Sequence, residues 1–207
     1  MSVVYFNLIT VTGPRPAVLA FRHDALRQFS PSLRKAIGLP RVDLSLEKLF
    51  RKHRLAAPSS DGIPDDGGDY CTRALPMTEW NAYARTLYEF HIKNNEIHAF
   101  LVPLSRCYRE LCFVDSEICL DDGSITSVYV SRGRASTWEP PEDRQNFHWE
   151  RAAKEHGVAN LDDAYEDDEV RSDVEDSMLL EALKHWDQRV LRVLRKHSQS
   201  SKQRDCL

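Results

Sequence analysis

Two arginines in the middle of the chain are the residues best suited to bind a ligand. Arg132 and Arg134 flank Gly133 near the end of an expected strand, and Trp138 follows shortly after. A guanidinium can form paired hydrogen bonds with a phosphate, and an aromatic ring can stack on a base. Together with the basic residues at 51–54 they predict a strip that binds nucleic acid. The acidic run at 162–176 would then compete with the nucleic acid for these cations. The predicted strip consists of Arg51, Lys52, Arg54, Arg132, Arg134 and Trp138.

Two simpler interpretations of these cations remain open. They either pair with the acidic run in the folded protein or only solvate the edge of a sheet, where charged side chains are common. The net charge of −4 gives no general preference for nucleic acid or for membranes.

Signatures of the common catalytic and metal-binding sites are missing from the sequence. His148 and His156 share an expected helix with Glu150 and Glu155, but no H-E-x-x-H motif and no Cys pair accompanies them. The acids at 61–69 lack the register of a calcium loop. There is no G-x-S-x-G elbow and no phosphate-binding glycine loop. The sequence therefore predicts no catalytic residue, no metal site and no cofactor.

The cysteines and the N-terminal residues indicate the cellular compartment in which the protein is expected. The five cysteines are odd in number and form no CxxC motif, which is typical of reduced thiols in a cytosol. Cys112 and Cys119 fall in an expected strand, where they act as small apolar side chains. The first residues show no signal-peptide pattern, and no window approaches the roughly 18 apolar residues of a spanning helix. We expect a cytoplasmic protein with no membrane partner.

The first half of the chain alternates between expected strands and helices. Residues 3–12 are rich in β-formers and predict a strand that ends at a Gly-Pro turn. Apolar residues at helical spacing predict a helix over 15–29, and 44–50 fits a short strand running into a helix. Residues 57–70 have loop composition. A broad apolar stripe predicts a second helix over 78–94.

The second half contains the clearest hairpin. Residues 108–120 and 124–136 are rich in β-formers, and the Asp-Asp-Gly between them suits a turn. The segment before them, 97–104, fits either a short strand or the tail of a helix. After the hairpin, early prolines and acids predict a helix from about 140 to His156 that Gly157 ends.

The C-terminal region combines an acidic run with an amphipathic helix. Nine of the sixteen residues from 161 to 176 are acidic, which is typical of a solvated linker. From 177 to 198 apolar residues recur at i, i+3, i+4 and i+7, and so wide a stripe must be covered by the chain's own core or by a second copy. The residues predicted to dock are Leu179, Leu183, Trp186, Val190 and Leu194.

This order predicts an α+β fold with a core domain at 1–160. We expect a two-layer sandwich of ferredoxin-like type, in which helices cover one face of a mostly antiparallel sheet and the C-terminal amphipathic helix is added to it. The linker at 161–176 and the helix at 177–198 complete the expected organisation.

Three segments resemble a family of phage- and plasmid-encoded proteins. They are VVYFNLITVTGP at 3–14, LSLEKLF at 44–50 and STWEPPED at 136–143, and the resemblance spans about 1–157. It implies a ferredoxin-like domain without an established activity, and it carries no functional residues. The chain departs from the family at 94–100, which lacks the expected Trp-Gly-rich segment, and at 162–169, where acids replace a late strand.

Three functions are consistent with the sequence. The first is a non-enzymatic accessory or interaction protein of phage or mobile-element origin, with a protein partner or a second copy docked on the C-terminal helix. The second is a weak nucleic-acid-binding protein that uses the basic strip. The third is an enzyme of unrecognised type, since an active site is spatial and one sequence hides it.

Overall fold

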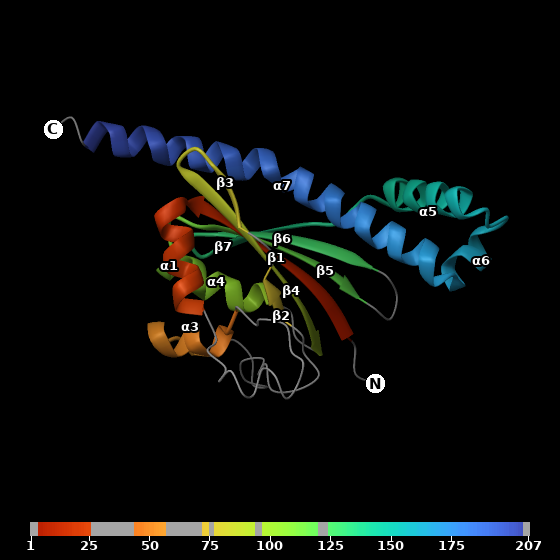
Figure 1. Cartoon of the computed structure of the whole chain (residues 1–207), viewed down its shortest axis with the longest axis horizontal. Coiled ribbons are helices and arrows are strands. Elements are labelled where there is room, and N and C mark those ends of the chain that lie inside the picture. The colour runs from red at the N-terminus through yellow and green to blue at the C-terminus, as the bar shows by residue number, and fades with distance from the viewer. Residues whose placement is uncertain are drawn as a thin grey trace.

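The computed structural model describes six stretches of the chain. They are residues 4–25, 44–56, 72–74, 77–93, 97–119 and 124–204. Within them the chain folds as an antiparallel sheet with helices on both faces (Figure 1). The predicted α+β class with an antiparallel sheet is confirmed. Among the described helices, none combines the length and the apolar character needed to cross a membrane.

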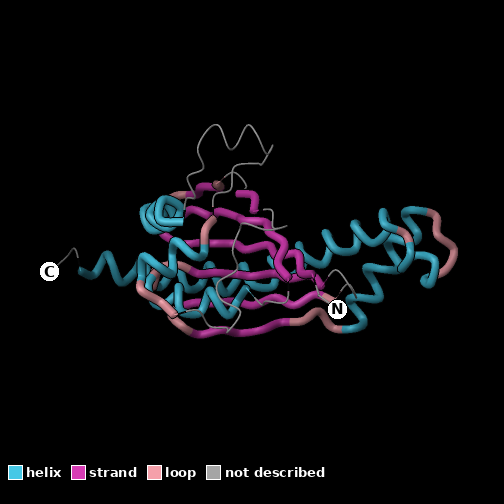
Figure 2. The backbone as a smooth tube through the Cα atoms, turned by 90° about the horizontal axis from the view of Figure 1, so that it is seen from below, coloured by secondary structure: helices cyan, strands magenta, loops and turns pink. Residues whose placement is uncertain are grey.

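The sheet has seven strands in the order β2-β4-β1-β5-β6-β7, with β3 paired to β4. All of the described pairings are antiparallel, and Figure 2 shows the strands running side by side. The strands are β1 (Val4–Pro14), β2 (Thr72–Ala74), β3 (Thr78–Trp80), β4 (Tyr83–Lys93), β5 (Cys112–Cys119), β6 (Ile125–Ser131) and β7 (Arg134–Trp138).

The first predicted strand is confirmed as β1, which runs further than expected. It stays paired with β4 as far as Pro14, opposite Tyr83, so Gly13 lies within the strand instead of ending it. A Cβ atom on Gly13 would lie 2.5 Å from Leu111 Cδ2. Glycine therefore allows the segment that leads into β5 to approach the strand closely.

The predicted helix over 78–94 is wrong, because this segment forms β3 and β4. Asn81 has a positive φ of 53° in the turn between them. Ala84, Thr86 and Tyr88 point to one face of the sheet and are buried there, while Leu87 packs on the other face. Since helices cover both faces, both sides of the strand carry apolar residues, and the alternation that marks a half-exposed strand is lost.

Three helices lie on one face of the sheet, below it in Figure 1. They are α1 (Arg15–Ala25), α3 (Leu46–His53) and α4 (Ile97–Cys107). Their apolar residues form one core with the inner residues of β1, β4, β5 and β6. Segment 97–104 is thus helical, and 44–50 contains a helix that Ser45 caps, with no strand before it in the described part.

The predicted hairpin is confirmed as β5 and β6, but its second strand, predicted over 124–136, turns back at residues 132–133 and continues as β7. The predicted turn at 121–123 and the predicted loop at 57–70 lie outside the described residues. The predicted third helix is α5 (Glu142–His156). Gly157 ends it with a φ of 74°, and its N–H bonds back to the carbonyls of Ala153 and Lys154. This is the left-handed C-terminal cap for which glycine is favoured.

The opposite face of the sheet is covered by α7 (Asp168–Arg204), above the sheet in Figure 1. Trp186, Val190 and Leu194 pack there against Cys112 and Tyr129 of the sheet. The C-terminal helix therefore forms a third layer on its own chain.

The acidic run at 161–176 is helical, so its interpretation as a solvated linker is corrected. It contains α6 (Leu161–Glu166) and the first turns of α7. Acids are favourable at helix N-termini, and Asp167 Oδ1 accepts hydrogen bonds from the backbone N–H groups of residues 169 and 170. Ala164, Val170 and Val174 are buried against α5 and the sheet. The apolar residues among the acids therefore anchor the run.

His156 connects α5 to the start of α7. Its Nε2 lies 2.7 Å from Asp173 Oδ2, and its Nδ1 lies 3.7 Å from Glu169 Oε2. The hydrogen bond with Asp173 raises the pKa of His156 above its ordinary value. Because the folded-state pKa is raised, the contact stabilises the fold fully below about pH 6.5 and is lost as the pH rises through the folded-state pKa.

Replacing Asp173 with asparagine is expected to lower the pKa of His156 towards its ordinary value, because the partner loses its charge. Titration of the imidazole Hε1 signal by NMR measures this pKa in both proteins. If both proteins gave the same value, Asp173 would not be the cause of the shift.

Candidate functional site

The predicted Arg132 and Arg134 lie beside the tight turn between β6 and β7. Arg132 has a φ of 53° and Gly133 a φ of 77°, so two consecutive residues are in the left-handed region. The Gly133 N–H donates to Ser105 Oγ of α4 at 2.7 Å, and a Cβ at this glycine would lie 2.4 Å from Arg106 Nε. The turn is thus held against the C-terminal end of α4.

This packing places four exposed arginines together. Arg132 Nε donates to the carbonyl oxygen of Arg109 at 3.3 Å, and Arg109 Nε donates to the carbonyl oxygen of Arg106, also at 3.3 Å. Arg134 is paired with Ser131 across the turn. We name these four residues, Arg106, Arg109, Arg132 and Arg134, the arginine end. The sequence predicted only the last two, because α4 was not recognised as a helix that ends at this turn.

The basic residues of α3 adjoin the arginine end through Tyr108. His53 at the end of α3 lies edge-to-face with the Tyr108 ring, with centroids 4.9 Å apart. Tyr108 also donates to Asp24 Oδ2 at 2.8 Å, and Lys52 forms an ion pair with the same carboxylate. Burial alone would raise the pKa of Asp24, but the hydrogen bonds from Lys52 and Tyr108 outweigh it and lower this pKa. Lys52 is therefore already partnered inside the protein.

The other two predicted cations of α3 differ in their surroundings. Arg51 forms an ion pair with Glu47 one turn earlier on the same helix. Arg54 is the left-handed C-cap of α3, with a φ of 52°, and its side chain is exposed. Arg51 and Lys52 thus form ion pairs within the chain, whereas Arg54 is exposed at the end of α3.

Trp138 does not join the arginines. It lies at the far end of β7 from Arg134, about 13 Å along the strand. Its indole ring stacks on the His185 ring of α7, with centroids 4.8 Å apart and an interplanar angle of 19°. One face of the ring is therefore covered by the protein itself.

The acidic run lies at the opposite end of the molecule from the arginine end. In Figure 1, α6 and the start of α7 are at the right, whereas the C-terminal end of α4 is at the left. Within the described residues, acids of the run contact nearby side chains, as between Asp173 and His156 or between Glu175 and Arg171. The run is thus too far away to form ion pairs with the arginines of the arginine end.

The predicted docking residues of the C-terminal helix face the sheet of the same chain. Leu179 is buried and Leu183 is partly buried in the cluster that includes Leu8 and Ile118. Trp186 Nε1 donates to Ser127 Oγ at 3.0 Å, and its ring stacks on Tyr129. The sequence left open whether the apolar stripe of this helix packs on the chain's own core or on a second copy. In the structure it packs on the chain's own core.

The burial of Cys112 makes its thiol unreactive. Its side chain is in the core under α7, and burial raises the pKa of its thiol. The Tyr129 hydroxyl lies 3.4 Å from Cys112 Sγ. A buried, protonated thiol is a poor nucleophile.

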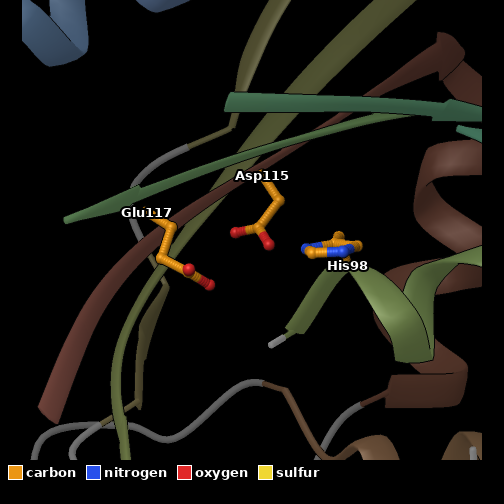
Figure 3. A group of neighbouring side chains, drawn as sticks. All are labelled: His98, Asp115 and Glu117. Atoms are coloured by element: carbon orange, nitrogen blue, oxygen red, sulfur yellow. The ribbon is translucent and has the colours of Figure 1, made fainter. Parts of the chain in front are cut away.

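A second polar cluster was not predicted from the sequence. His98 of α4 and Asp115 and Glu117 of β5 converge between the helix and the sheet (Figure 3). The two carboxylates are two residues apart and therefore on one face of the strand. Two acids at this spacing in an otherwise apolar strand are a weak signal, and His98 comes from a helix that the sequence left ambiguous.

No family model matches this chain, and no curated protein or solved structure is significantly similar to it.

Proposed function

We propose that this protein is a non-enzymatic accessory protein that binds single-stranded nucleic acid through the arginine end. The observation that supports this most is the convergence of Arg106 at the end of α4 and Arg109 just after it with Arg132 of the β6–β7 turn and Arg134 at the start of β7. Arginine forks form paired hydrogen bonds with phosphates, which a nucleic-acid backbone offers at every nucleotide.

The geometry of the arginine end also favours an extended anion. The four arginines of the arginine end are exposed, and Glu110 is the exposed acid next to them in the chain. A strand with a phosphate at each nucleotide can contact several of them and releases counterions as it binds. Trp138 is not part of the proposed surface, so we expect little stacking and little base preference.

The proposal predicts a binding affinity that depends strongly on salt. Each phosphate contact on a single strand contributes about 0.7 to the slope of log K against log salt. Replacing both Arg132 and Arg134 with glutamine is therefore expected to reduce this slope by about 1.4 and to weaken binding at low salt. Fluorescence anisotropy with a labelled thymidine oligonucleotide, between about 50 and 200 mM NaCl, measures both quantities.

A matched control has the same change in net charge at the other end of the protein. Arg144 and Lys154 are exposed on α5, and glutamine at both positions should leave affinity and slope nearly unchanged. Equal losses in the two double variants would mean that net charge alone attracts the oligonucleotide. Absence of salt-dependent binding by the unmodified protein would also refute the proposal.

Further parts of the proposal concern topology and origin. We include in it the ferredoxin-like arrangement of the core, a cytoplasmic location, and the phage or mobile-element origin that the resemblance of the first 157 residues implies. The three-layer packing described above is compatible with a ferredoxin-like core to which α7 has been added.

A further inference from the structure

His98, Asp115 and Glu117 have the spacing of metal ligands. One ligand atom from each side chain can be chosen so that all three lie within 4.8 Å of one another. Ligands on opposite sides of a small divalent ion are about 4.0–4.4 Å apart, because each lies about 2.0–2.2 Å from the metal. A small movement of the side chains would therefore close the cluster around one ion.

Both acids of the cluster are removed from solvent. Asp115 is 0% exposed and Glu117 is 9% exposed. Across the sheet Asp115 pairs with Ile9 of β1 and Val128 of β6. A carboxylate that is removed from water is stabilised by a cation, a proton or hydrogen bonds. A divalent cation between the two acids would stabilise both of them at once.

Asn7 of β1 supplies a fourth polar group at the same place. It is fully buried and is paired with Glu117 across the sheet. With its amide nitrogen turned towards the acids, it donates to Asp115 Oδ1 at 3.3 Å and to Glu117 Oε2 at 3.2 Å. With its amide oxygen turned towards them, it adds an oxygen ligand. The same side chain thus suits both a metal-free and a metal-bound state.

We propose that His98, Asp115 and Glu117 bind a divalent cation of the Mn²⁺ type, with Asn7 as an oxygen ligand. Two carboxylates and an amide oxygen favour hard cations such as Mg²⁺ and Mn²⁺, whereas imidazole favours first-row transition metals. Mn²⁺ satisfies both preferences. His98 is in the first turn of α4 and faces the two acids (Figure 3), whereas the arginine end lies at the C-terminal end of this helix, so the two sites are separate.

Titration of the full-length protein with Mn²⁺ alone tests the proposal. The EPR signal of free Mn²⁺ gives the number of ions bound, and thermal unfolding with and without Mn²⁺ gives an independent measure. We expect one ion per chain and a higher Tm with the metal. Glu117→Gln and His98→Ala should each weaken binding by at least about tenfold, which is the lower end of the loss seen when even supporting residues are changed.

Asp173→Asn is a matched control, since it removes a carboxylate that contacts a different histidine, His156. It should bind Mn²⁺ as the unmodified protein does. Circular dichroism establishes that each variant is folded, and Glu117→Gln preserves side-chain volume for this purpose.

Two results would overturn the proposal. The first is the absence of Mn²⁺ binding by the unmodified protein, which would mean that the Asn7 amide and the positive end of α4 neutralise the acids. The second is binding that persists unchanged in folded Glu117→Gln and His98→Ala, which would place the ion elsewhere. Neither result depends on whether the arginine end binds nucleic acid.

Discussion

Trp186→Ala is expected to lower the free energy of unfolding by about 3–5 kcal/mol, as is typical of a large buried aromatic residue. Trp186 is 3% exposed and lies in the layer between α7 and the sheet. The change removes the stacking on Tyr129, the hydrogen bond to Ser127 and the contact with the Arg189 guanidinium. Urea denaturation followed by circular dichroism measures the loss as a lower midpoint at a similar slope.

Leu180→Ala provides the comparison on the same helix. Leu180 is 55% exposed, so this change should cost about 0.5 kcal/mol or less. Sedimentation should show the same oligomeric state for both variants and for the unmodified protein, since Trp186 contacts its own chain. A loss of stability of equal size in the two variants would contradict the packing of α7 on the sheet.

A chain that ends at Asn160 is expected to aggregate or to remain only partly folded. Without α6 and α7, the sheet would expose Val114, Ile118 and Tyr129, which are almost completely buried in the whole protein. Exposed apolar surface of this kind drives association. Sedimentation and the binding of a hydrophobic dye measure the result, and the thermal transition should lose its cooperativity.

A shorter truncation is the control for this experiment. A chain that ends at Lys196 keeps Leu194 and the rest of the described interface between α7 and the sheet, so it should stay monodisperse and unfold cooperatively. If the chain ending at Asn160 behaved in the same way, residues 1–160 would be an independent domain. The organisation predicted from the sequence would then be correct.

The sequence predicted those elements whose signals are local. β1, the β5–β6 hairpin, α5 with its Gly157 cap and the apolar stripe of α7 each depend on residues close together in the chain. The prediction was wrong where a distant segment changes the environment. β4 resembles a helix in its apolar content because α7, about a hundred residues later, covers its second face. The acidic run was taken for a linker because its few apolar residues are outnumbered by acids.

The candidate sites show the same division between local and distant information. Arg132 and Arg134 were predicted because they are neighbours in sequence, whereas Arg106 and Arg109 join them only through the contact of α4 with the β6–β7 turn. The cluster around Asp115 has no local motif at all. Its histidine comes from a helix, and Asn7 comes from a strand more than a hundred residues earlier.

In the described part of the chain, charges of opposite sign are separated along the long axis. The acidic first turns of α7 lie at the right of Figure 1, and the C-terminal end of α4, where the arginine end begins, lies towards the left. A protein of small net charge whose positive and negative residues lie at different ends is oriented by the field of a polyanion before the two make contact. The approach would then be end-on, and its rate would fall steeply as ionic strength shortens the Debye length from about 30 Å at 0.01 M to about 8 Å at 0.15 M.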